Sequence, residues 1–242
     1  MQSVVQIKNL EKKYGNFKLS VDRLVINEGE VFGLIGKNGA GKTTLLDLIL
    51  NEIACDLGEI LVFGRDNHKY NNEIKNNLGF MIDNASFSKD FKLREIDLVL
   101  RRIYKNWDSD YYFQLIKEFG LEPKANLGSL SKGMAIKAQL SVSLAHFPKL
   151  LILDEITSGL DPVSRLELLD LLNSYMAQNP NRTILFSTHI IDDLFRVATR
   201  VGCLNAGKFV FLENIEQHSE QSINLMLQNY TENFEVSRCE GC

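Results

Sequence analysis

One short segment constrains this chain more than any other. Residues Gly36–Thr43 read Gly-Lys-Asn-Gly-Ala-Gly-Lys-Thr, directly after the apolar run Val31–Ile35 and before the helical run Thr44–Leu50. The glycines let consecutive backbone amides turn inward, and the positive end of the following helix points at the same place. A strand, such a loop and a helix in this order predict a phosphate-binding loop. The residues expected to surround the phosphates are Gly36, Lys37, Asn38, Gly39, Ala40, Gly41, Lys42, Thr43 and Thr44.

Two side chains of this loop and two acidic residues are candidates for binding phosphate and metal and for activating water. Lys42 places a positive charge at the outer phosphates, and the Thr43 hydroxyl can be a ligand of Mg²⁺, which prefers oxygen. A second apolar run, Leu150–Leu153, ends in Asp154 and Glu155. Hydrolysis needs a carboxylate for the metal and a group that orients or deprotonates water. We therefore expect Asp154 to hold the metal and Glu155 to activate the water.

Strand signals dominate the first 65 residues. The predicted strands there cover residues 4–10, 18–26, 30–35 and 59–63. Later short apolar runs lie beside helical stretches, which is typical of a parallel sheet covered on both faces. These runs cover residues 78–82, 150–153, 183–187 and 200–204. The sequence therefore predicts an α/β fold.

Helical periodicity marks the segment between two of these strands. Residues 84–147 are expected to form a helical insert, in which Leu93, Ile96, Leu100 and Ile103 follow spacings of three and four. Asp161 and Pro162 predict the start of a long helix that runs to about residue 178, because Asp caps free amides and Pro loses no bond there. We expect one domain over 1–242, with a core of 1–83 and 148–212 and a tail of 213–242 in which only 221–229 is weakly helical.

Charge and hydropathy exclude several kinds of protein. The chain has 27 Lys and Arg against 31 Asp and Glu, a net charge of −4, so no overall positive field favours nucleic acid as a partner. Its apolar runs fall far short of the roughly 20 residues that cross a bilayer, and charge follows Met1 too soon for a secretory signal. A cytoplasmic location is therefore expected.

The four cysteines add little chemistry to this interpretation. Cys55 and Cys203 lie in apolar surroundings and are expected to be core residues. Cys239 and Cys242 have the CxxC spacing, but two thiolates are half of a usual zinc set, so a free tail is expected.

The order of the motifs resembles one family. Along 4–212 the chain resembles the ATP-binding subunits of ABC transporters. The residues that carry the resemblance are Tyr14, Gly36–Thr43, Asp83, Leu130–Met134 (Leu-Ser-Lys-Gly-Met), Leu150–Glu155, Ser158–Asp161 and His189. The resemblance implies a phosphate-loop ATPase with a mixed or parallel sheet core, an N-terminal antiparallel β subdomain and an inserted α-helical subdomain.

The resemblance also implies the roles of individual residues. Tyr14 would stack on the adenine of ATP, and Ser131 and Gly133 would reach the γ-phosphate bound to the opposite subunit of a head-to-tail dimer. Asp161 would bridge the two subunits of that homodimer or heterodimer. His189 would contact the γ-phosphate and hold the attacking water.

Three departures from the family pattern stand out. Position 83 is usually Gln, and here it is Asp, which adds a carboxylate to the expected Mg²⁺ shell. Lys132 and Met134 replace the third and fifth residues of the usual Leu-Ser-Gly-Gly-Gln. Ile156 replaces the Pro that usually follows the acidic pair. The segment 78–87 resembles the bacitracin- and lantibiotic-type exporters, whereas Ile156 also occurs at this place in the soluble ATPases of iron–sulfur cluster assembly.

Two functions therefore stay open, and a third is remote. The first is an ATP-hydrolysing subunit that drives a separate membrane permease for export, from the inner face of the membrane. Residues 83–95 would then line a groove for a permease helix with Phe80, Phe87 and Phe91, although each of these could simply be a core residue. The second is a soluble ATPase of an assembly complex such as iron–sulfur cluster assembly. A small-molecule kinase would leave Ser131–Gly133 and Ser158–Asp161 unexplained.

Overall fold

The structure is a computed structural model that describes residues 2–82 and 87–223 together with 225, 226, 228 and 229. Its strands are β1 (Ser3–Tyr14), β2 (Phe17–Asn27), β3 (Val31–Ile35), β4 (Leu57–Val62), β5 (Arg65–Asp66), β6 (Leu78–Met81), β7 (Leu150–Asp154), β8 (Thr183–Thr188), β9 (Arg200–Asn205) and β10 (Lys208–Asn214). Its helices are α1 (Lys42–Ile49), α2 (Asn71–Lys75), α3 (Leu93–Leu100), α4 (Ser109–Glu118), α5 (Lys132–Leu144), α6 (Pro162–Gln178) and α7 (Ile191–Val197). The predicted α/β fold class is confirmed.

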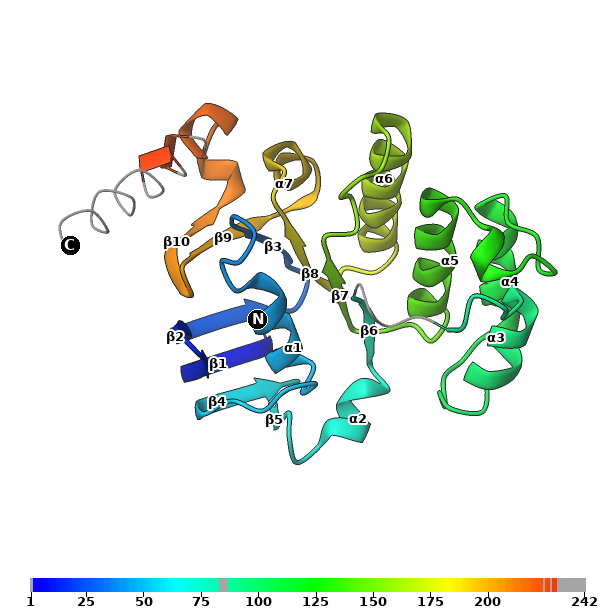
Figure 1. Cartoon of the computed structure of the whole chain (residues 1–242), viewed down its shortest axis with the longest axis horizontal. Helices are drawn as coiled ribbons and strands as arrows, with labels where there is room; N and C mark the ends of the chain where they lie inside the picture. The colour runs from blue at the N-terminus through cyan, green and yellow to red at the C-terminus, as the bar shows by residue number, and fades with distance from the viewer. Residues whose placement is uncertain (1, 83–86, 224, 227, 230–242) are drawn as a thin grey trace.

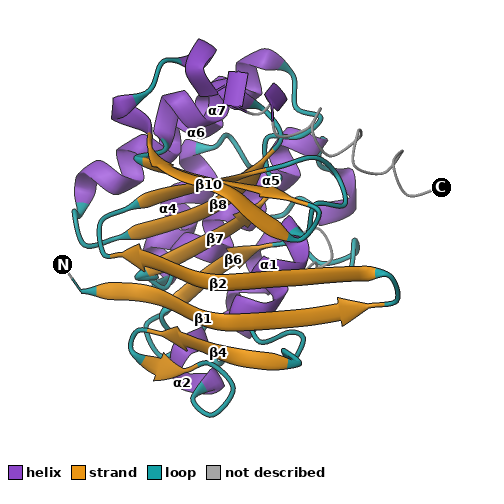
Figure 2. Ribbon diagram, turned by 90° about the vertical axis from the view of Figure 1, so that its left-hand side faces the viewer, coloured by secondary structure: helices purple, strands orange, loops and turns teal. Residues whose placement is uncertain are grey.

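The strands form one mixed ten-stranded sheet in the order β5-β4-β1-β2-β10-β9-β3-β8-β7-β6. Figure 2 shows the long strands β1 and β2 side by side, with β4 beyond β1. This end of the sheet is antiparallel. β1 and β2 continue past their predicted ends at 10 and 18, where charged residues replace the apolar pattern and the Lys18–Glu11 pair joins the two strands across 2.6 Å. Cross-strand pairing therefore extends a hairpin that hydropathy alone would end early.

The other half of the sheet is parallel and covered on both faces. Alternate residues of a strand point to opposite faces. Phe32 and Leu34 of β3 pack in one cluster with the leucines of α1, whereas Val31 and Ile35 pack in another cluster with α6 and α7. Continuous apolar strands between two helical layers are the pattern the sequence predicts, and this part of the prediction is confirmed.

Strand β10 was not predicted. It pairs antiparallel with β9 through the two-residue turn Ala206-Gly207, in which both residues have positive φ. Such a turn fits the twist of a hairpin. Gly207 also lies against β2, where an added Cβ would come within 2.0 Å of the Lys18 carbonyl oxygen. β10 therefore joins the antiparallel and parallel halves of the sheet.

Helices α3, α4 and α5 gather on one side of the molecule, away from β1, β2 and β4 (Figure 1). They share a separate apolar cluster that contains Leu93, Ile96 and Leu100. The prediction that Ile103 continues this apolar face is wrong, because α3 ends at Leu100 and the Ile103 side chain is 62% exposed.

Helix α6 begins as predicted. The Asp161 carboxylate accepts hydrogen bonds from the amides of Val163 and Ser164, and Pro162 is the first helical residue. Hydrogen bonds from Ser164, through its hydroxyl and its amide, lower the pKa of Asp161. Within the described ranges, no helix combines the length and apolar character needed to cross a membrane.

Of the two described cysteines, Cys203 is a core residue, as expected, and Cys55 lies at the edge of the core. Cys203 is buried, and its burial raises the pKa of the thiol to about 12. Cys55 is half-buried against the cluster that contains α1. Cys239 and Cys242 lie outside the described residues. In the tail, residues 220–223 and the described residues up to 229 are helical, where the sequence predicts a weak helix.

Candidate nucleotide site

The phosphate loop leaves β3 and leads into α1. Gly39 and Gly41 have φ values of 79° and 107°, a conformation that other residues rarely adopt. At Gly36 an added Cβ would come within 2.3 Å of the Leu204 carbonyl oxygen. The loop therefore needs glycine for its backbone path and for its close approach to β9.

The ammonium group of Lys42 lies inside the curve of this loop. Only 5% of the residue is exposed. Its Nζ donates hydrogen bonds to the carbonyl oxygens of Gly36 at 2.8 Å and Lys37 at 3.3 Å, and it pairs with Glu155 Oε1 at 3.0 Å. A single positive charge is thus held within the phosphate loop, and it pairs with the carboxylate that follows β7, two strands away from β3 in the sheet.

Thr43 and Asp154 meet at the start of α1. The Thr43 hydroxyl donates to Asp154 Oδ2 at 2.7 Å, and Asp154 Oδ1 accepts from the Ser187 hydroxyl. Partial burial, followed by the charges of Asp154 and Glu52, raises the pKa of Asp47 on α1. A hydroxyl and a carboxylate in contact, within a negative field, suit a small divalent cation that prefers oxygen ligands.

Glu155 stands at the centre of the site. Its φ is 48°, and its amide donates to the Ser187 carbonyl and hydroxyl at 3.2 and 3.0 Å. This unusual conformation turns the carboxylate toward Lys42 on one side and toward His189 on the other, whose Nδ1 lies 3.4 Å from Glu155 Oε2. Residues that are 113 and 34 positions away from Glu155 in the sequence thus flank it in the fold.

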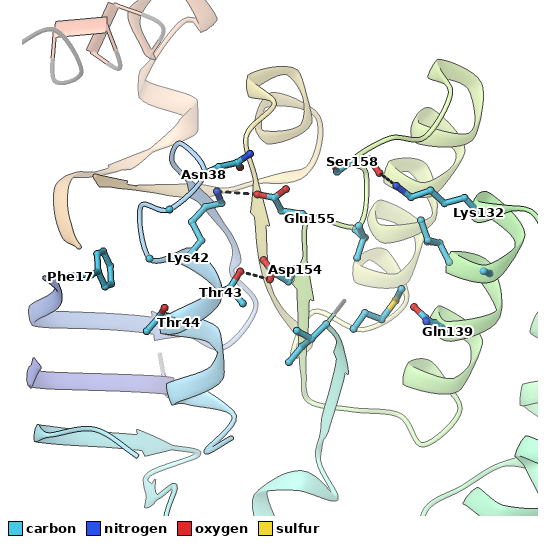
Figure 3. A pocket seen from close by; sticks show the side chains of 17 residues that line it. Phe17, Asn38, Lys42, Thr43, Thr44, Lys132, Gln139, Asp154, Glu155 and Ser158 are labelled. Carbon is cyan, nitrogen blue, oxygen red and sulfur yellow. Dashed lines mark hydrogen bonds and ion pairs between the residues drawn. The ribbon is translucent and has the colours of Figure 1, made fainter. Parts of the chain in front are cut away.

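These groups open into a cleft of about 910 Å³. Figure 3 shows the phosphate loop and Glu155 on one wall and α5 on the opposite wall, which carries Lys132 and Gln139. Lys132 Nζ donates to the Ser158 carbonyl oxygen at 2.7 Å. The helical insert therefore faces the phosphate loop across open space.

The cleft also contains an aromatic ring that was not predicted to be a site residue. Phe17 lines the cleft, and its ring lies where a Cβ on Gly41 would come within 2.8 Å of it. Tyr14 is its cross-strand partner, is 46% exposed, and is absent from the cleft lining. Both aromatics flank the same turn at Gly15, and that position was the available signal.

Ser131, Gly133 and Asp161 lie together on the surface, where α5 and α6 begin. We call this surface the rim. The Ser131 hydroxyl caps α5 by accepting a hydrogen bond from the Met134 amide at 3.3 Å. An added Cβ on Gly133 would lie 3.5 Å from the hydroxyl of Ser164, in the first turn of α6. The residues that the resemblance assigns to a second subunit are thus neighbours on the surface. Asp83, predicted to be a metal ligand, lies outside the described residues.

A phosphate loop, an oxygen pair suited to a cation and a carboxylate beside both define a phosphate-loop nucleotide hydrolase. The family model described as "ABC transporter" matches residues 19–158. The chain is 34% identical over 214 residues to the bacitracin transport ATP-binding protein BcrA of Bacillus licheniformis, covering 87% of this chain and 69% of that protein. It is 31% identical to the ABC transporter ATP-binding protein YtrB of Bacillus subtilis (strain 168), covering 93% of this chain and 76% of that one.

The fold agrees with solved structures. The structure titled "Structure of ATP binding subunit of ABC transporter" aligns with a TM-score of 0.82 at 24% identity, over 94% of this chain and 99% of that one. The chain belongs to the family of ABC transporter ATP-binding proteins. Proteins of this family hydrolyse ATP, so the chain is an ATPase.

Proposed function

We propose that this chain is the ATP-hydrolysing subunit of an exporter and drives a separately encoded membrane permease. The arrangement of Lys42, Glu155 and His189 beside Thr43 and Asp154 carries the proposal. The printed names of similar proteins include bacitracin transport and, at 34% identity in Rhizobium leguminosarum bv. viciae, Nod factor export. These names favour export over the alternative of an assembly complex.

The proposed chemistry follows from the positions of the side chains. The loop amides and Lys42 would bind the phosphates of ATP, and Thr43 and Asp154 would hold Mg²⁺. When bound, the cation neutralises charge that develops between the β- and γ-phosphates. Glu155 accepts a proton from the water that attacks the γ-phosphorus, and the bond to the ADP oxygen breaks. His189 contacts the γ-phosphate on the far side of Glu155.

The second half of the site is proposed to come from another subunit. Ser131 and Gly133 are assigned to the γ-phosphate of the opposite chain, and Asp161 to the contact between subunits. The observations in support are that Ser131 is exposed and that α5, whose N-terminal amides suit an anion, begins beside it. A head-to-tail pair would close the cleft between the phosphate loop of one chain and α5 of the other.

The base of ATP is proposed to stack on an aromatic of the β1–β2 hairpin. Tyr14 remains the residue that the resemblance assigns, and Phe17 is a second candidate because it lines the cleft. Stacking on one aromatic ring contributes about 1–3 kcal/mol. Comparing ATP affinity in Tyr14→Ala and Phe17→Ala by calorimetry decides between them, since the variant that loses the stacked ring binds at least about fivefold more weakly.

A separate apolar groove is proposed to receive the permease. It has a volume of about 390 Å³ and lies between β6 and the insert helices, with Phe80, Phe87 and Val142 in its lining. Phe91 packs against the insert cluster instead, with its ring 5.7 Å from that of Phe87. A short permease helix in this groove would hold the chain peripherally on the cytoplasmic face of the membrane.

Affinity purification of the full chain from its native membranes tests this function. We expect a multispanning membrane protein to co-purify with the wild-type chain and to be lost in Val142→Asp, which places a charge in the groove. Leu98→Asp is the matched control, because Leu98 is 45% exposed and lies outside the groove lining. Recovery of cluster-assembly proteins instead of a permease would favour the alternative.

A further inference from the structure

A buried carboxylate next to the site takes no direct part in the proposed ATP hydrolysis. Asp193, on α7, has no exposed surface. A carboxylate deprived of water is costly unless hydrogen bonds and a positive charge replace the water. Both of its oxygens are engaged, so the full set of its contacts shows what the fold gains from keeping it.

Three segments of the chain converge on Asp193. Oδ2 accepts hydrogen bonds from the hydroxyls of Thr157 at 2.6 Å and Thr188 at 3.0 Å. Oδ1 accepts from Nε of Arg165 at 2.5 Å. We call Asp193, Thr157, Thr188 and Arg165 the Asp193 cluster. Both threonines are buried, so their hydroxyl groups have no water as an alternative partner.

Each partner in the cluster adjoins a residue of the proposed machinery. Thr157 follows Glu155 by two positions, and Thr188 directly precedes His189. The Thr188 hydroxyl also accepts a hydrogen bond from the Ile190 amide at 3.0 Å, so it fixes the backbone on both sides of His189. The cluster thus anchors the two strand ends whose side chains meet at 3.4 Å between Glu155 and His189.

Arg165 connects the Asp193 carboxylate to the rim of this chain that is proposed to contact the second subunit. Its amide donates to the Asp161 carbonyl oxygen at 3.0 Å in the first turn of α6. The guanidinium supplies the charge that balances the buried carboxylate, and its Nη2 also lies 3.8 Å from Asp192 Oδ2. One acidic group therefore connects the segments of Glu155, His189 and Asp161.

We propose that Asp193 is a positioning residue for hydrolysis. It fixes the positions of Glu155 and His189 relative to each other and to the segment of Asp161. The His189 side chain is exposed and that of Glu155 is half-buried, so their mutual geometry depends on the backbone segments that carry them. A misplacement of about 1 Å in such a pair can cost on the order of 10²-fold in rate. The inference rests on the proposed roles of Glu155 and His189.

Paired threonine substitutions separate positioning from a purely structural role. Thr188→Val and Thr157→Val remove a hydroxyl with little change in shape, whereas Thr188→Ser and Thr157→Ser retain it. We expect the valine variants to lower the kcat of ATP hydrolysis by about tenfold or more with an unchanged Kd for ATP, because the phosphate loop is not altered. The serine variants should stay within about twofold of the wild-type kcat.

A double variant tests whether the Thr188 hydroxyl acts through His189. In single-turnover assays on the full chain, Thr188→Val should cost little further rate once His189→Ala is present, since the two changes remove one function. Wild-type kcat in the valine variants, equal loss in valine and serine variants, a parallel loss of ATP affinity, additive losses, or failure of both valine variants to fold would each overturn the proposal. If His189→Ala alone keeps the wild-type rate, the assigned role of His189 fails instead, and with it the proposal that depends on it.

Discussion

The two walls of the nucleotide cleft differ in how complete they are. On the phosphate-loop wall, Lys42 is almost fully buried and Thr43 is bonded to Asp154, so the charged groups are held by partners in the same chain. On the α5 wall, Ser131 and Lys132 are exposed, and Lys132 extends toward the Ser158 carbonyl oxygen (Figure 3). The charged and polar groups of the phosphate-loop wall are thus more buried than Ser131 and Lys132, which are exposed.

The origin of each wall explains the difference. β3, β8 and β7 are parallel neighbours in the sheet, so the phosphate loop, His189 and Asp154 follow carboxyl ends that meet at one edge. The α5 wall belongs to the helical insert, in which α3 and α4 share a separate apolar cluster, while Leu140 and Leu144 of α5 pack with β7 and α6. A site that needs both walls therefore depends on how the insert, or a second copy of it, approaches the sheet.

The largest effect is expected on the phosphate-loop wall, where a change at Glu155 should separate ATP binding from ATP cleavage. Glu155→Gln keeps the shape of the side chain but replaces the base with a very poor one, so kcat should fall by roughly 10²–10⁴-fold while ATP still binds. Two uncleaved ATP molecules should then hold two chains together through Ser131 and Gly133. Size-exclusion chromatography with light scattering should show a dimer with Mg-ATP and a monomer with ADP.

The control for this experiment alters the opposite wall. Adding Ser131→Arg to Glu155→Gln should restore the monomer in Mg-ATP, because a bulky charged side chain would block the contact across subunits. A dimer that survives this change removes Ser131 from the interface. A monomer under every condition leaves pairing with a different ATPase chain as the explanation.

The next effect concerns affinity. Lys42→Ala removes charge-assisted hydrogen bonds worth about 1.5–3 kcal/mol each, so ATP binding should weaken at least tenfold or become undetectable by calorimetry. Lys8→Ala, an exposed lysine on β1, serves as the matched control and should bind like the wild type. Circular dichroism should show that both variants are folded, and wild-type affinity in Lys42→Ala would contradict the assigned phosphate site.

A smaller effect is expected at Asp83, the position where the family usually has Gln. A carboxylate at Asp83 should add to the affinity for Mg²⁺. Asp83→Gln should therefore raise the Mg²⁺ concentration that gives half-maximal ATPase activity. An unchanged metal titration would place Asp83 outside the metal shell.

The smallest effect tests how the insert is attached to the sheet. His146 is buried after α5, and its Nε2 lies 3.1 Å from the Leu78 carbonyl oxygen on β6. Burial lowers the pKa of His146, so below about pH 6.5 the unfolded chain binds a proton that the folded chain resists. The free energy of unfolding should fall as pH drops from about 7 to 5, by no more than about 1.4 kcal/mol per pH unit from this group.

Denaturant titrations at several pH values check this expectation. His146→Gln lacks the ionisable ring, so its unfolding free energy should depend less steeply on pH across this range. The other three histidines remain in both proteins and contribute equally. If the unfolding free energy depends equally on pH in the two proteins, protonation of His146 does not destabilise the fold.

Local patterns were sufficient for much of the fold. The phosphate loop depends on glycine dihedral angles and on a strand and helix directly beside it, and α6 depends on a cap one residue before Pro162. The Asp154-Glu155 pair follows directly from the end of an apolar strand. The predictions for these segments agree with the described secondary structure because each depends on interactions between residues only a few positions apart.

Contacts across the chain decided the remainder. Ser187 and Asp154 are 33 positions apart, Phe17 and Gly41 are 24, and Thr157 and Asp193 are 36. At such separations the sequence carries no periodic signal. The turn Ala206-Gly207 and its strand β10 were missed in the same way, because β10 is stabilised by pairing with β9 and by its contact with β2.

The sequence by itself determined which chemical groups this protein carries and the local elements that present them, since dihedral preferences and caps act over a few residues. The tertiary structure decided which groups meet. The order of strands in the sheet brings the ends of β3, β8 and β7 to one edge, where Glu155 contacts both Lys42 and His189. The packing of α7 brings Asp193 to the ends of β7 and β8. Such contacts depend on burial and hydrogen bonding between distant segments, which form only when the whole core is assembled.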